Sequence, residues 1–369
     1  MTTNAASPQT DAERTQALVG RLFETGLGTM DLLSIYIGDS LGYYQALSRA
    51  ASGFTPAQLA RRTGTHARYA REWLEQQAAT GFIAVTTPSD DPAKRRFSLP
   101  AHTAEAFLDV NSLNYIAPIA RMLVAAAKRA PDLIDAYRTG GGVTWTQFGP
   151  DMREAQAAFN RPMYLNLFAK EYLPSVKDIH VRLRKGRPAR VADIACGGGW
   201  SSIAVALAYP DAEIDGFDLD RPSITMARKN ARAAGVSDRV RFHTRDAAES
   251  DLAGKYDLVL ICEALHDMSQ PVSVLKTTRR LAGKGGAVVI MDERVSESFE
   301  APANPVDRFM YGASILVCLP DGMSHKPTAA TGTVMRPATL KKYAAAAGFK
   351  DVEVLPIQND FFRFYRLRQ

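Results

Sequence analysis

The sequence predicts an α/β fold, in which a doubly wound, Rossmann-like sheet with an antiparallel last strand follows a mostly helical region containing a winged helix. The main observation is a glycine cluster near residue 197, which joins an apolar run to a helix of small residues and precedes further apolar runs alternating with helical segments. At 369 residues the chain exceeds what one core usually supports. We therefore expect three parts: N-terminal helices and a winged helix at 1–100, a helical connector or lid at 101–189, and a ligand-binding sheet domain at 190–369.

The first hundred residues predict helices followed by a hairpin. Apolar residues recur at helical spacing from Asp11 to Arg49. The expected elements after this segment are a short helix from Thr55 to Gly64, a helix at Thr65–Ala79, and strands at Phe82–Thr86 and Arg96–Leu99. Helix, helix and hairpin in this order indicate a winged helix.

A winged helix can read DNA with the second of its helices. Through residue 100, however, ten Lys or Arg residues stand against nine Asp or Glu residues, and Glu72 and Glu75 lie in that second helix. Sequence-independent DNA affinity follows the number of phosphates that are neutralised. We therefore expect this region to dimerise or to help build a substrate pocket, without a nucleic-acid partner.

Five aromatic residues lie in the helical connector shortly before the glycine cluster: Trp145, Phe148, Phe159, Tyr164 and Phe168. Aromatic side chains at such a place can cover a cofactor and form an apolar substrate pocket. They can equally pack in the core between domains. The sequence leaves both interpretations open.

The runs after the glycine cluster predict a mostly parallel sheet. Leu258 to Cys262 is continuously apolar, as expected for a central parallel strand. The last two runs, DVEVLP and FFRFYRLR, are separated by only a few residues, so these strands must be antiparallel. An antiparallel closing strand distinguishes this sheet from that of dinucleotide dehydrogenases.

The glycine cluster predicts a nucleoside site. Glycines allow a sharp turn and a close approach of ligand to backbone, while the following helix presents free N–H groups. Asp218 ends the next apolar run 19 positions after Gly199, where a carboxylate can accept hydrogen bonds from ribose hydroxyls. The dinucleotide pattern G-x-G-x-x-G is filled at two of its three places, because Ser202 stands at the third.

A second pattern, acid-x-G-x-G-x-G, fits better. Asp193, Ala195, Gly197 and Gly199 fill it with one substitution of Gly by Ala. The carboxylate of Asp193, at the start of the pattern, can orient the loop and contact a cationic ligand. A dinucleotide does not suit this position, because its pyrophosphate is an anion. This stretch resembles the first motif of class I S-adenosylmethionine (SAM)-dependent methyltransferases, which implies SAM as the cofactor.

Further cofactor contacts are expected at the ends of the neighbouring strands. Leu219 follows Asp218, and Cys262 ends the fourth strand. Asp246 and Ala247 follow the run VRFHT, which is the expected third strand of the sheet. A carboxylate at this position can accept a hydrogen bond from the adenine amino group. Ligands bind outside the carboxyl ends of strands in open parallel sheets.

The stretch from Asp257 to Asp267 resembles plant-type small-molecule O-methyltransferases, in which His-Asp-Trp follows the fourth strand and the His is the general base. Here the triplet is His266-Asp267-Met268. The resemblance implies that His266 accepts the proton as a neutral imidazole and that Asp292, on the fifth strand, orients it. The second acid that this family carries before its last helix has no counterpart in Thr333-Val334-Met335.

The resemblance covers most of the chain, because those enzymes also carry an N-terminal winged helix, used for dimerisation. The sequence is more similar still to a bacterial group of winged-helix class I methyltransferases that includes mycobacterial members. The resemblance implies a homodimer and methyl transfer to a small, apolar or aromatic hydroxyl compound. The alternatives are a SAM-sensing transcriptional regulator and a SAM-binding protein that does not transfer methyl groups.

Composition limits the partners, the cellular location and the metal sites that we expect. The net charge of +6 does not require a nucleic-acid partner, and no apolar stretch approaches the roughly 18 residues that span a bilayer. The polar N-terminus predicts no signal peptide, and three well-separated cysteines are typical of a reduced cytoplasm. We expect no metal site, because the histidines other than His266 lack paired ligand spacing: His66, His102, His180, His243 and His325.

Overall fold

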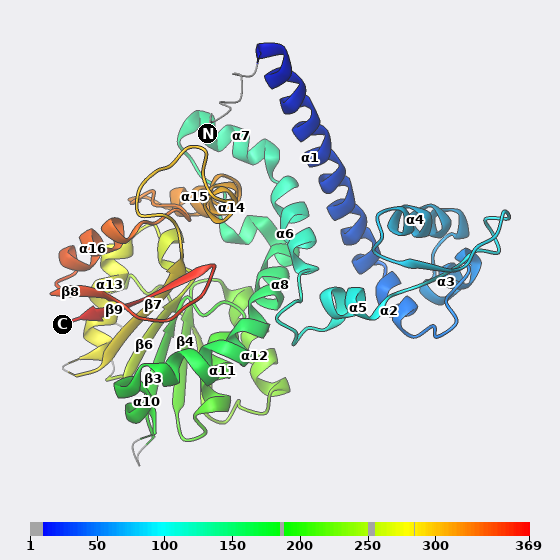
Figure 1. The fold of residues 1–369 in the computed structure, drawn as a ribbon. Helices are drawn as coiled ribbons and strands as arrows, with labels where there is room; N and C mark the ends of the chain where they lie inside the picture. The colour runs from blue at the N-terminus through cyan, green and yellow to red at the C-terminus, as the bar shows by residue number, and fades with distance from the viewer. Residues whose placement is uncertain (1–9, 185–187, 250–254, 284) are drawn as a thin grey trace, which may run out of the picture. The chain divides into compact units, whose positions relative to one another are not determined.

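The computed structural model describes residues 10–184, 188–249, 255–283 and 285–369 (Figure 1). The chain divides into two compact units, Met1–Ala120 and Arg121–Gln369. The expected division into three parts with boundaries at 100 and 189 stays a prediction.

The first unit contains the helices and the hairpin that the sequence predicts. Its elements are α1 (Asp11–Ser40), α2 (Tyr43–Ser48), α3 (Pro56–Thr63), α4 (Ala67–Ala79), β1 (Ala84–Thr87), β2 (Arg96–Ser98) and α5 (Ala101–Leu108). Strands β1 and β2 pair antiparallel. Helix α3 begins where the side chains of Thr55 and Gln58 form a reciprocal capping box, and it ends at Gly64 in the left-handed conformation, with φ of 69°.

An aromatic cluster holds the first unit together. Tyr43 and Tyr44 each contact Trp73 edge-on, with ring centroids 4.8 and 5.1 Å apart, and Tyr44 also contacts Phe107. The hydroxyl of buried Tyr44 donates to the side chain of Gln77, so its polar atom has a partner inside the core. These contacts join α2, α4 and α5.

The helical region between the hairpin and the sheet continues with α6 (Pro118–Ala127), α7 (Ala130–Thr139), α8 (Trp145–Met163), the π-helix η1 (Tyr164–Tyr172), α9 (Leu173–Ser175) and α10 (Lys177–Leu183). Gly140 ends α7 in the left-handed conformation, with φ of 71°. Gly149, with φ of 81°, kinks α8 near its start. Left-handed glycines thus end one helix of this region and kink the next.

The second unit is built on a seven-stranded sheet whose order is β5-β4-β3-β6-β7-β9-β8 (Figure 1). The strands are β3 (Arg190–Ile194), β4 (Glu213–Asp218), β5 (Val240–Thr244), β6 (Leu258–Cys262), β7 (Ala287–Glu293), β8 (Asp351–Val354) and β9 (Phe362–Arg368). Strands β3 to β7 are parallel, and β9 lies antiparallel between β7 and β8. The predicted antiparallel closing strand is confirmed.

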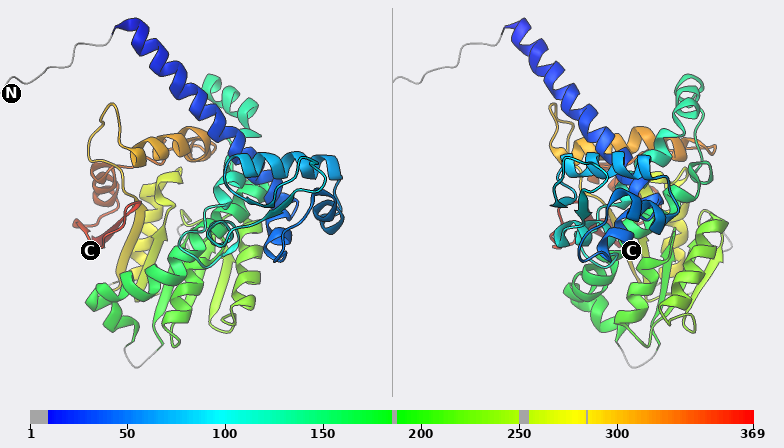
Figure 2. Two further views of the ribbon diagram at one scale, coloured as in Figure 1. Left: turned by 45° about the vertical axis from the view of Figure 1, so that its right-hand side comes forward. Right: turned by 90° about the vertical axis from the view of Figure 1, so that its right-hand side faces the viewer.

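Helices cover both faces of this sheet (Figure 1; Figure 2). Consecutive strand residues alternate between two cores: Leu258 and Leu260 belong to one, and Val259 and Ile261 to the other. The first core includes residues of α10, α11 (Trp200–Ala208) and α12 (Arg221–Ala233), and the second includes residues of α13 (Pro271–Ala282) and α16 (Pro337–Ala346). Because every strand position from 258 to 262 is buried, the run is continuously apolar.

The long segment after β7 contains helical elements. It forms α14 (Pro305–Ala313), the π-helix η3 (Ser314–Cys318) and α15 (Leu319–Met323). Two hydrogen bonds join it to the α7–α8 connection: the N–H of Trp145 donates to Asp321 at 2.7 Å, and the N–H of Val143 donates to the carbonyl of Pro320 at 3.0 Å. These contacts place α15 beside the start of α8.

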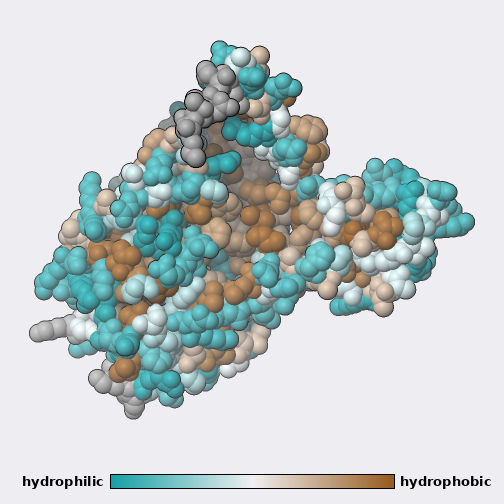
Figure 3. Space-filling model, viewed as in Figure 1, coloured by the Kyte–Doolittle hydropathy of each residue, from teal (hydrophilic) through white to brown (hydrophobic). Residues whose placement is uncertain are grey.

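The surface in the view of Figure 3 mixes hydrophilic and hydrophobic residues, as most protein surfaces do. In the described parts of the chain, no helix combines the length and the apolar character needed to cross a membrane.

Candidate functional site

The glycine loop follows β3 and leads into α11. Ala195, Gly197 and Gly199 all have positive φ, at 55°, 50° and 78°. A Cβ atom on Gly199 would also lie 2.6 Å from the ring of Phe242 and 2.9 Å from Ala227. The alternating glycine pattern therefore has a physical cause, because the turn needs left-handed backbone at every second residue and has no space at Gly199.

Ala195 occupies a left-handed position at which the resembled motif has glycine. For a residue with a Cβ atom this conformation costs about 1–2 kcal/mol. We expect Ala195→Gly to stabilise the protein by about 0.5–1 kcal/mol, because relief of this strain exceeds the added entropy of the unfolded chain. Urea unfolding measures the change. Ala330 also has positive φ, at 51°, and lies outside the loop, so Ala330→Gly is the matched control. The prediction is contradicted if Ala195→Gly loses stability while Ala330→Gly does not.

Asp193 lies in β3 and is buried. Its Oδ2 accepts hydrogen bonds from the hydroxyls of Ser201 and Ser202, both at 2.6 Å, while its Oδ1 has no hydrogen-bond partner. Burial raises the pKa of this carboxyl. Asp193 thus fixes the first turn of α11, as expected of a loop-orienting acid, and its free oxygen matches a hydrogen-bond donor on a ligand.

Asp218 ends β4 and joins that strand to the glycine loop. Its Oδ2 accepts from the N–H of Gly197 and its Oδ1 accepts from the N–H of Asp220, both at 2.8 Å. Each carboxylate oxygen can accept a further hydrogen bond. Burial raises the pKa of Asp218 to about 6, with the nearby carboxylates of Asp220 and Asp193 contributing. Leu219, next in the chain, has an exposed side chain.

A buried ion pair holds α8 against this region. Nε of Arg153 donates to Oδ2 of Asp220 at 2.7 Å, and the same Oδ2 accepts the N–H of Ser223 at the start of α12. Sequence reasoning missed Arg153 and Asp220, since 67 residues separate them.

The other expected cofactor residues lie at the ends of neighbouring parallel strands. Asp246 follows β5, is exposed, and accepts the N–H of Ala248 at 2.8 Å. Ala247 is partly buried, and Cys262 is buried at the end of β6. Because β3 to β6 are parallel, the ends of these strands reach the same edge of the sheet as the glycine loop.

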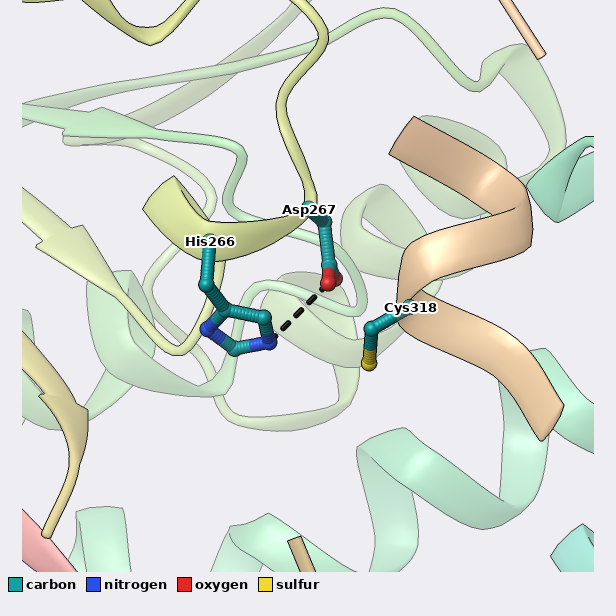
Figure 4. A group of neighbouring side chains, drawn as sticks. All are labelled: His266, Asp267 and Cys318. Carbon is teal, nitrogen blue, oxygen red and sulfur yellow. Dashed lines mark ion pairs between the residues drawn. The ribbon is translucent and has the colours of Figure 1, made fainter. Parts of the chain in front are cut away.

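The residues after β6 place His266 at this edge. His266 lies in the short turn η2 (Leu265–Asp267) and is 2% exposed. Its Nδ1 is 2.9 Å from Oδ1 of Asp292 on β7, in a hydrogen bond. Its Nε2 is 2.9 Å from Oδ1 of Asp267 in an ion pair, drawn in Figure 4, but that oxygen accepts no hydrogen bond. The structure thus brings His266 and Asp292 together as the sequence predicts.

The charge of His266 differs from the expectation. Burial lowers its pKa, but the carboxylates of Asp267 and Asp292 outweigh burial and hold the pKa well above its usual range. The pair of carboxylates therefore favours the imidazolium at neutral pH, whereas the sequence predicts a neutral imidazole. To accept a proton at Nε2, His266 must first release one, and Asp267 is the carboxylate beside that nitrogen.

Two further acids belong to the site and were missed from the sequence. Glu263 follows β6 with φ of 53°, and its carboxylate accepts from Asn160 Nδ2 at 3.0 Å and from the Tyr164 hydroxyl at 3.2 Å. Burial raises its pKa to about 7. Glu293 on β7 is buried, which raises its pKa well above the usual value, and its Oε2 has no hydrogen-bond partner. Both acids are adjacent to predicted residues, Cys262 and Asp292, but no local sequence pattern indicates which side chains contact them.

The aromatic residues of the connector divide between two roles. Phe168 is fully buried and stacks on Phe364 of β9, with ring centroids 6.4 Å apart, so it belongs to the core. Phe148 is buried in a smaller apolar cluster with Val143 and Met152. Tyr164 instead reaches Glu263 beside the strand ends.

Comparisons with known proteins point to one fold. Residues 186–328 match the family model described as a methyltransferase domain. The ubiquinone biosynthesis O-methyltransferase of Aromatoleum aromaticum (strain DSM 19018 / LMG 30748 / EbN1) is 31% identical over 168 residues, 45% of this chain and 66% of that protein. That of Pseudomonas aeruginosa (strain LESB58) is 31% identical over 101 residues, 27% of this chain and 43% of that protein. The chain thus spans less than half of the Pseudomonas relative.

Solved structures match over nearly the whole chain. The mitomycin 7-O-methyltransferase MmcR has a TM-score of 0.70 at 19% identity, over 97% of this chain and 99% of that one. Human N-acetylserotonin methyltransferase in complex with SAM has a TM-score of 0.70 at 16% identity, over 99% of each chain. At these identities the likeness concerns the fold.

Proposed function

We propose that the protein transfers a methyl group from SAM to a hydroxyl oxygen of a small, apolar or aromatic compound, because residues 186–328 match the methyltransferase-domain model and the chain has the class I methyltransferase fold. The observation that carries the proposal is the glycine loop with Asp218 at the same sheet edge as the His266–Asp292 pair. The glycine loop with Asp218 fits a nucleoside cofactor, and the His266–Asp292 pair offers a proton acceptor.

The residues of the loop fit SAM. The free Oδ1 of Asp193 suits a cationic donor, and Asp218 can accept hydrogen bonds from two ribose hydroxyls while keeping its backbone contacts. Asp246 would accept from the adenine amino group, and Leu219, Ala247 and Cys262 would line the same site. When bound, SAM supplies an activated methyl group on a sulfonium that is already a good leaving group.

The chain's own contribution is alignment and proton removal. Holding the acceptor oxygen in line with the methyl group supplies most of the rate. His266 takes the hydroxyl proton at Nε2 after that nitrogen has released its own proton toward Asp267, while Asp292 fixes the ring through Nδ1. General-base catalysis of this kind contributes about 10²–10⁴-fold.

The direct test is an incubation of the protein with methyl-labelled SAM and a library of small hydroxyl compounds. Transfer of label to a hydroxyl oxygen supports the proposal. If SAM binds but no compound is labelled, the protein senses SAM or uses it without methyl transfer. If SAM does not bind at all, the cofactor assignment is wrong.

SAM affinity should fall as the pH is lowered through about 6. In the folded protein burial raises the pKa of Asp218 to about 6, so the carboxylate is present above that pH and lost below it. A protonated carboxyl loses acceptor capacity for the ribose hydroxyls, so the dissociation constant should rise about tenfold per pH unit below the pKa. Calorimetric titration from about pH 5 to about pH 8 measures this dependence. Asp218→Asn should bind weakly with a flatter profile, and an unchanged profile in this variant would refute the assignment to Asp218.

We propose that the first unit does not bind DNA. On α4, Arg68 forms an ion pair with Glu72, and Arg95 of the hairpin pairs with Glu75 of the same helix at 2.8 Å, so these cations are already neutralised. Binding to mixed DNA fragments at physiological salt should be undetectable at micromolar protein. Tight DNA binding that is lost when Arg68 and Arg71 are both replaced by Ala would support a SAM-sensing transcriptional regulator instead.

We further propose a homodimer formed through α1, in a reduced cytoplasm where the three free cysteines remain thiols. Helix α1 carries a series of exposed apolar side chains: Leu18, Val19, Leu22, Phe23, Leu27, Met30, Leu33 and Ile37. Exposed apolar surface of this extent marks a contact site. Sedimentation equilibrium should give two chains per particle, and Leu22→Glu with Phe23→Glu should give one. A wild-type monomer would contradict the proposal.

A further inference from the structure

Three donor atoms of different chemical types converge beside the strand ends. Nε2 of His266, a carboxylate oxygen of Asp267 and Sγ of Cys318 all lie within 4.8 Å of one another (Figure 4). His266 and Asp267 come from η2, and Cys318 ends the π-helix η3, 51 residues later in the chain. In Figure 4 the imidazole ring, the carboxylate and the sulfur point toward a common space.

The contacts of His266 turn one ring nitrogen toward the trio. Asp292 occupies Nδ1 of His266 at 2.9 Å, so once the imidazolium has released a proton, the lone pair of the neutral ring lies on Nε2. Nε2 lies 2.9 Å from Oδ1 of Asp267, which is buried and accepts no hydrogen bond, so a bound metal ion would replace this ion pair. A carboxylate behind one ring nitrogen, with the other nitrogen facing the ion, is the arrangement of metal-binding histidines.

The two elements that carry the trio are held close together. A Cβ atom on Gly322 in α15 would lie 2.9 Å from the carbonyl oxygen of Asp267, so this glycine permits the helix to approach the turn. The preceding π-helix η3 delivers Cys318 to the same place. Single-turn π-helices frequently occur at functional sites.

We propose that His266 Nε2, the Asp267 carboxylate and Cys318 Sγ bind one Zn²⁺ ion and leave its fourth position open. Zn²⁺ takes nitrogen, sulfur and oxygen ligands, and its reactive sites keep three protein ligands and one exchangeable position. With metal–ligand bonds of about 2.0–2.3 Å, neighbouring donors of a tetrahedral site lie about 3.3–3.8 Å apart. The donor atoms of the trio lie within 4.8 Å of one another, which is near that spacing. On binding, Cys318 becomes a thiolate and His266 gives up its Nε2 proton, and both protons go to solvent.

Metal binding does not depend on methyl transfer, but its role rests on the proposed function. An acceptor hydroxyl in the open position would bond to Zn²⁺ through oxygen and lose its proton to solvent, because the ion lowers the pKa of a bound hydroxyl. Nε2 would then be a ligand and no longer the proton acceptor. His266 is required in both forms of the site.

Cobalt reports the binding without any turnover measurement. We would titrate the full-length, reduced, metal-free protein with Co²⁺, and expect tetrahedral absorption and a sulfur-to-cobalt charge-transfer band at one ion per chain, displaced by one equivalent of Zn²⁺. Cys318→Ser should lose the charge-transfer band. Asp292→Asn should weaken Zn²⁺ binding about 10–100-fold, because it supports the ligating His from behind.

His243→Gln is the matched control, because His243 forms a second His–Asp pair, 2.9 Å from Asp215, that is not part of the trio. This variant should keep the complete cobalt spectrum. A wild-type spectrum without the charge-transfer band, or a band that survives in a folded Cys318→Ser variant, would overturn the proposal. Circular dichroism establishes folding for each variant, and Asp267→Asn gives a second test if Cys318→Ser does not fold. Failure here would leave the methyl-transfer proposal intact.

Discussion

His266→Ala should lower turnover by roughly 10²–10⁴-fold on the substrate that the labelling experiment identifies. The variant removes the group proposed to take the acceptor proton, which lies at the strand edge with Nδ1 bound to Asp292. Its effect falls on the transition state, so SAM affinity should stay within a few fold. Single-turnover kinetics and calorimetric SAM titration measure the two quantities separately.

His180→Ala is a suitable control, because His180 on α10 contacts only the hydroxyl of Tyr209 among the hydrogen bonds described, at 3.0 Å. Its turnover should match the wild type. Asp292→Asn should also lower turnover, since the ring loses its charged partner at Nδ1. Near-wild-type turnover of His266→Ala would show that alignment alone carries the reaction and that His266 is structural.

Asp218→Ala should weaken SAM binding on the order of 10²–10⁴-fold, because two hydrogen bonds from ribose hydroxyls to a charged group are lost at about 1.5–3 kcal/mol each. The variant also removes the acceptor of the N–H groups of Gly197 and Asp220, so the glycine loop loses its connection to β4. Calorimetric titration with SAM gives the dissociation constant.

Leu219→Ala provides the neighbouring comparison for Asp218. The Leu219 side chain is 62% exposed, so its truncation should change SAM affinity far less than the loss of the carboxylate. Thermal unfolding of Asp218→Ala distinguishes lost binding from lost structure. Wild-type SAM affinity in a folded Asp218→Ala protein, or NADH binding by it, would refute the assignment of the cofactor site.

Local sequence patterns predict much of this fold. The run from Leu258 to Cys262 is apolar at every position because both faces of β6 are covered, and the strand has the predicted bounds. Helix α3 follows from Thr55-Pro56 and Gly64, where capping and left-handed geometry act within a few residues. Helix α4 begins two residues later than predicted, since His66 caps it by accepting the N–H of Arg68.

The candidate site is predictable only where its residues share a motif. Asp193 and Asp218 follow from the spacing of the glycine loop, and His266 from the stretch after β6. The partners from distant helices carry no local signal: Asn160 reaches Glu263 across 103 positions, and Cys318 joins His266 only through the packing of α15 on η2. Such contacts depend on tertiary packing, which one sequence does not encode in any short pattern.

The position of β9 affects how the chain folds during synthesis. Among the residues that the structure describes, β8 pairs only with β9, and β9 joins it to β7, so β8 enters this sheet through the later residues Phe362–Arg368. Until then the edge of β7, with its apolar residues Val288 to Met291, lacks a partner strand. A chain in which β9 has not yet paired therefore leaves the backbone N–H and C=O groups of this sheet edge unpaired, which favours pairing with a strand of another chain.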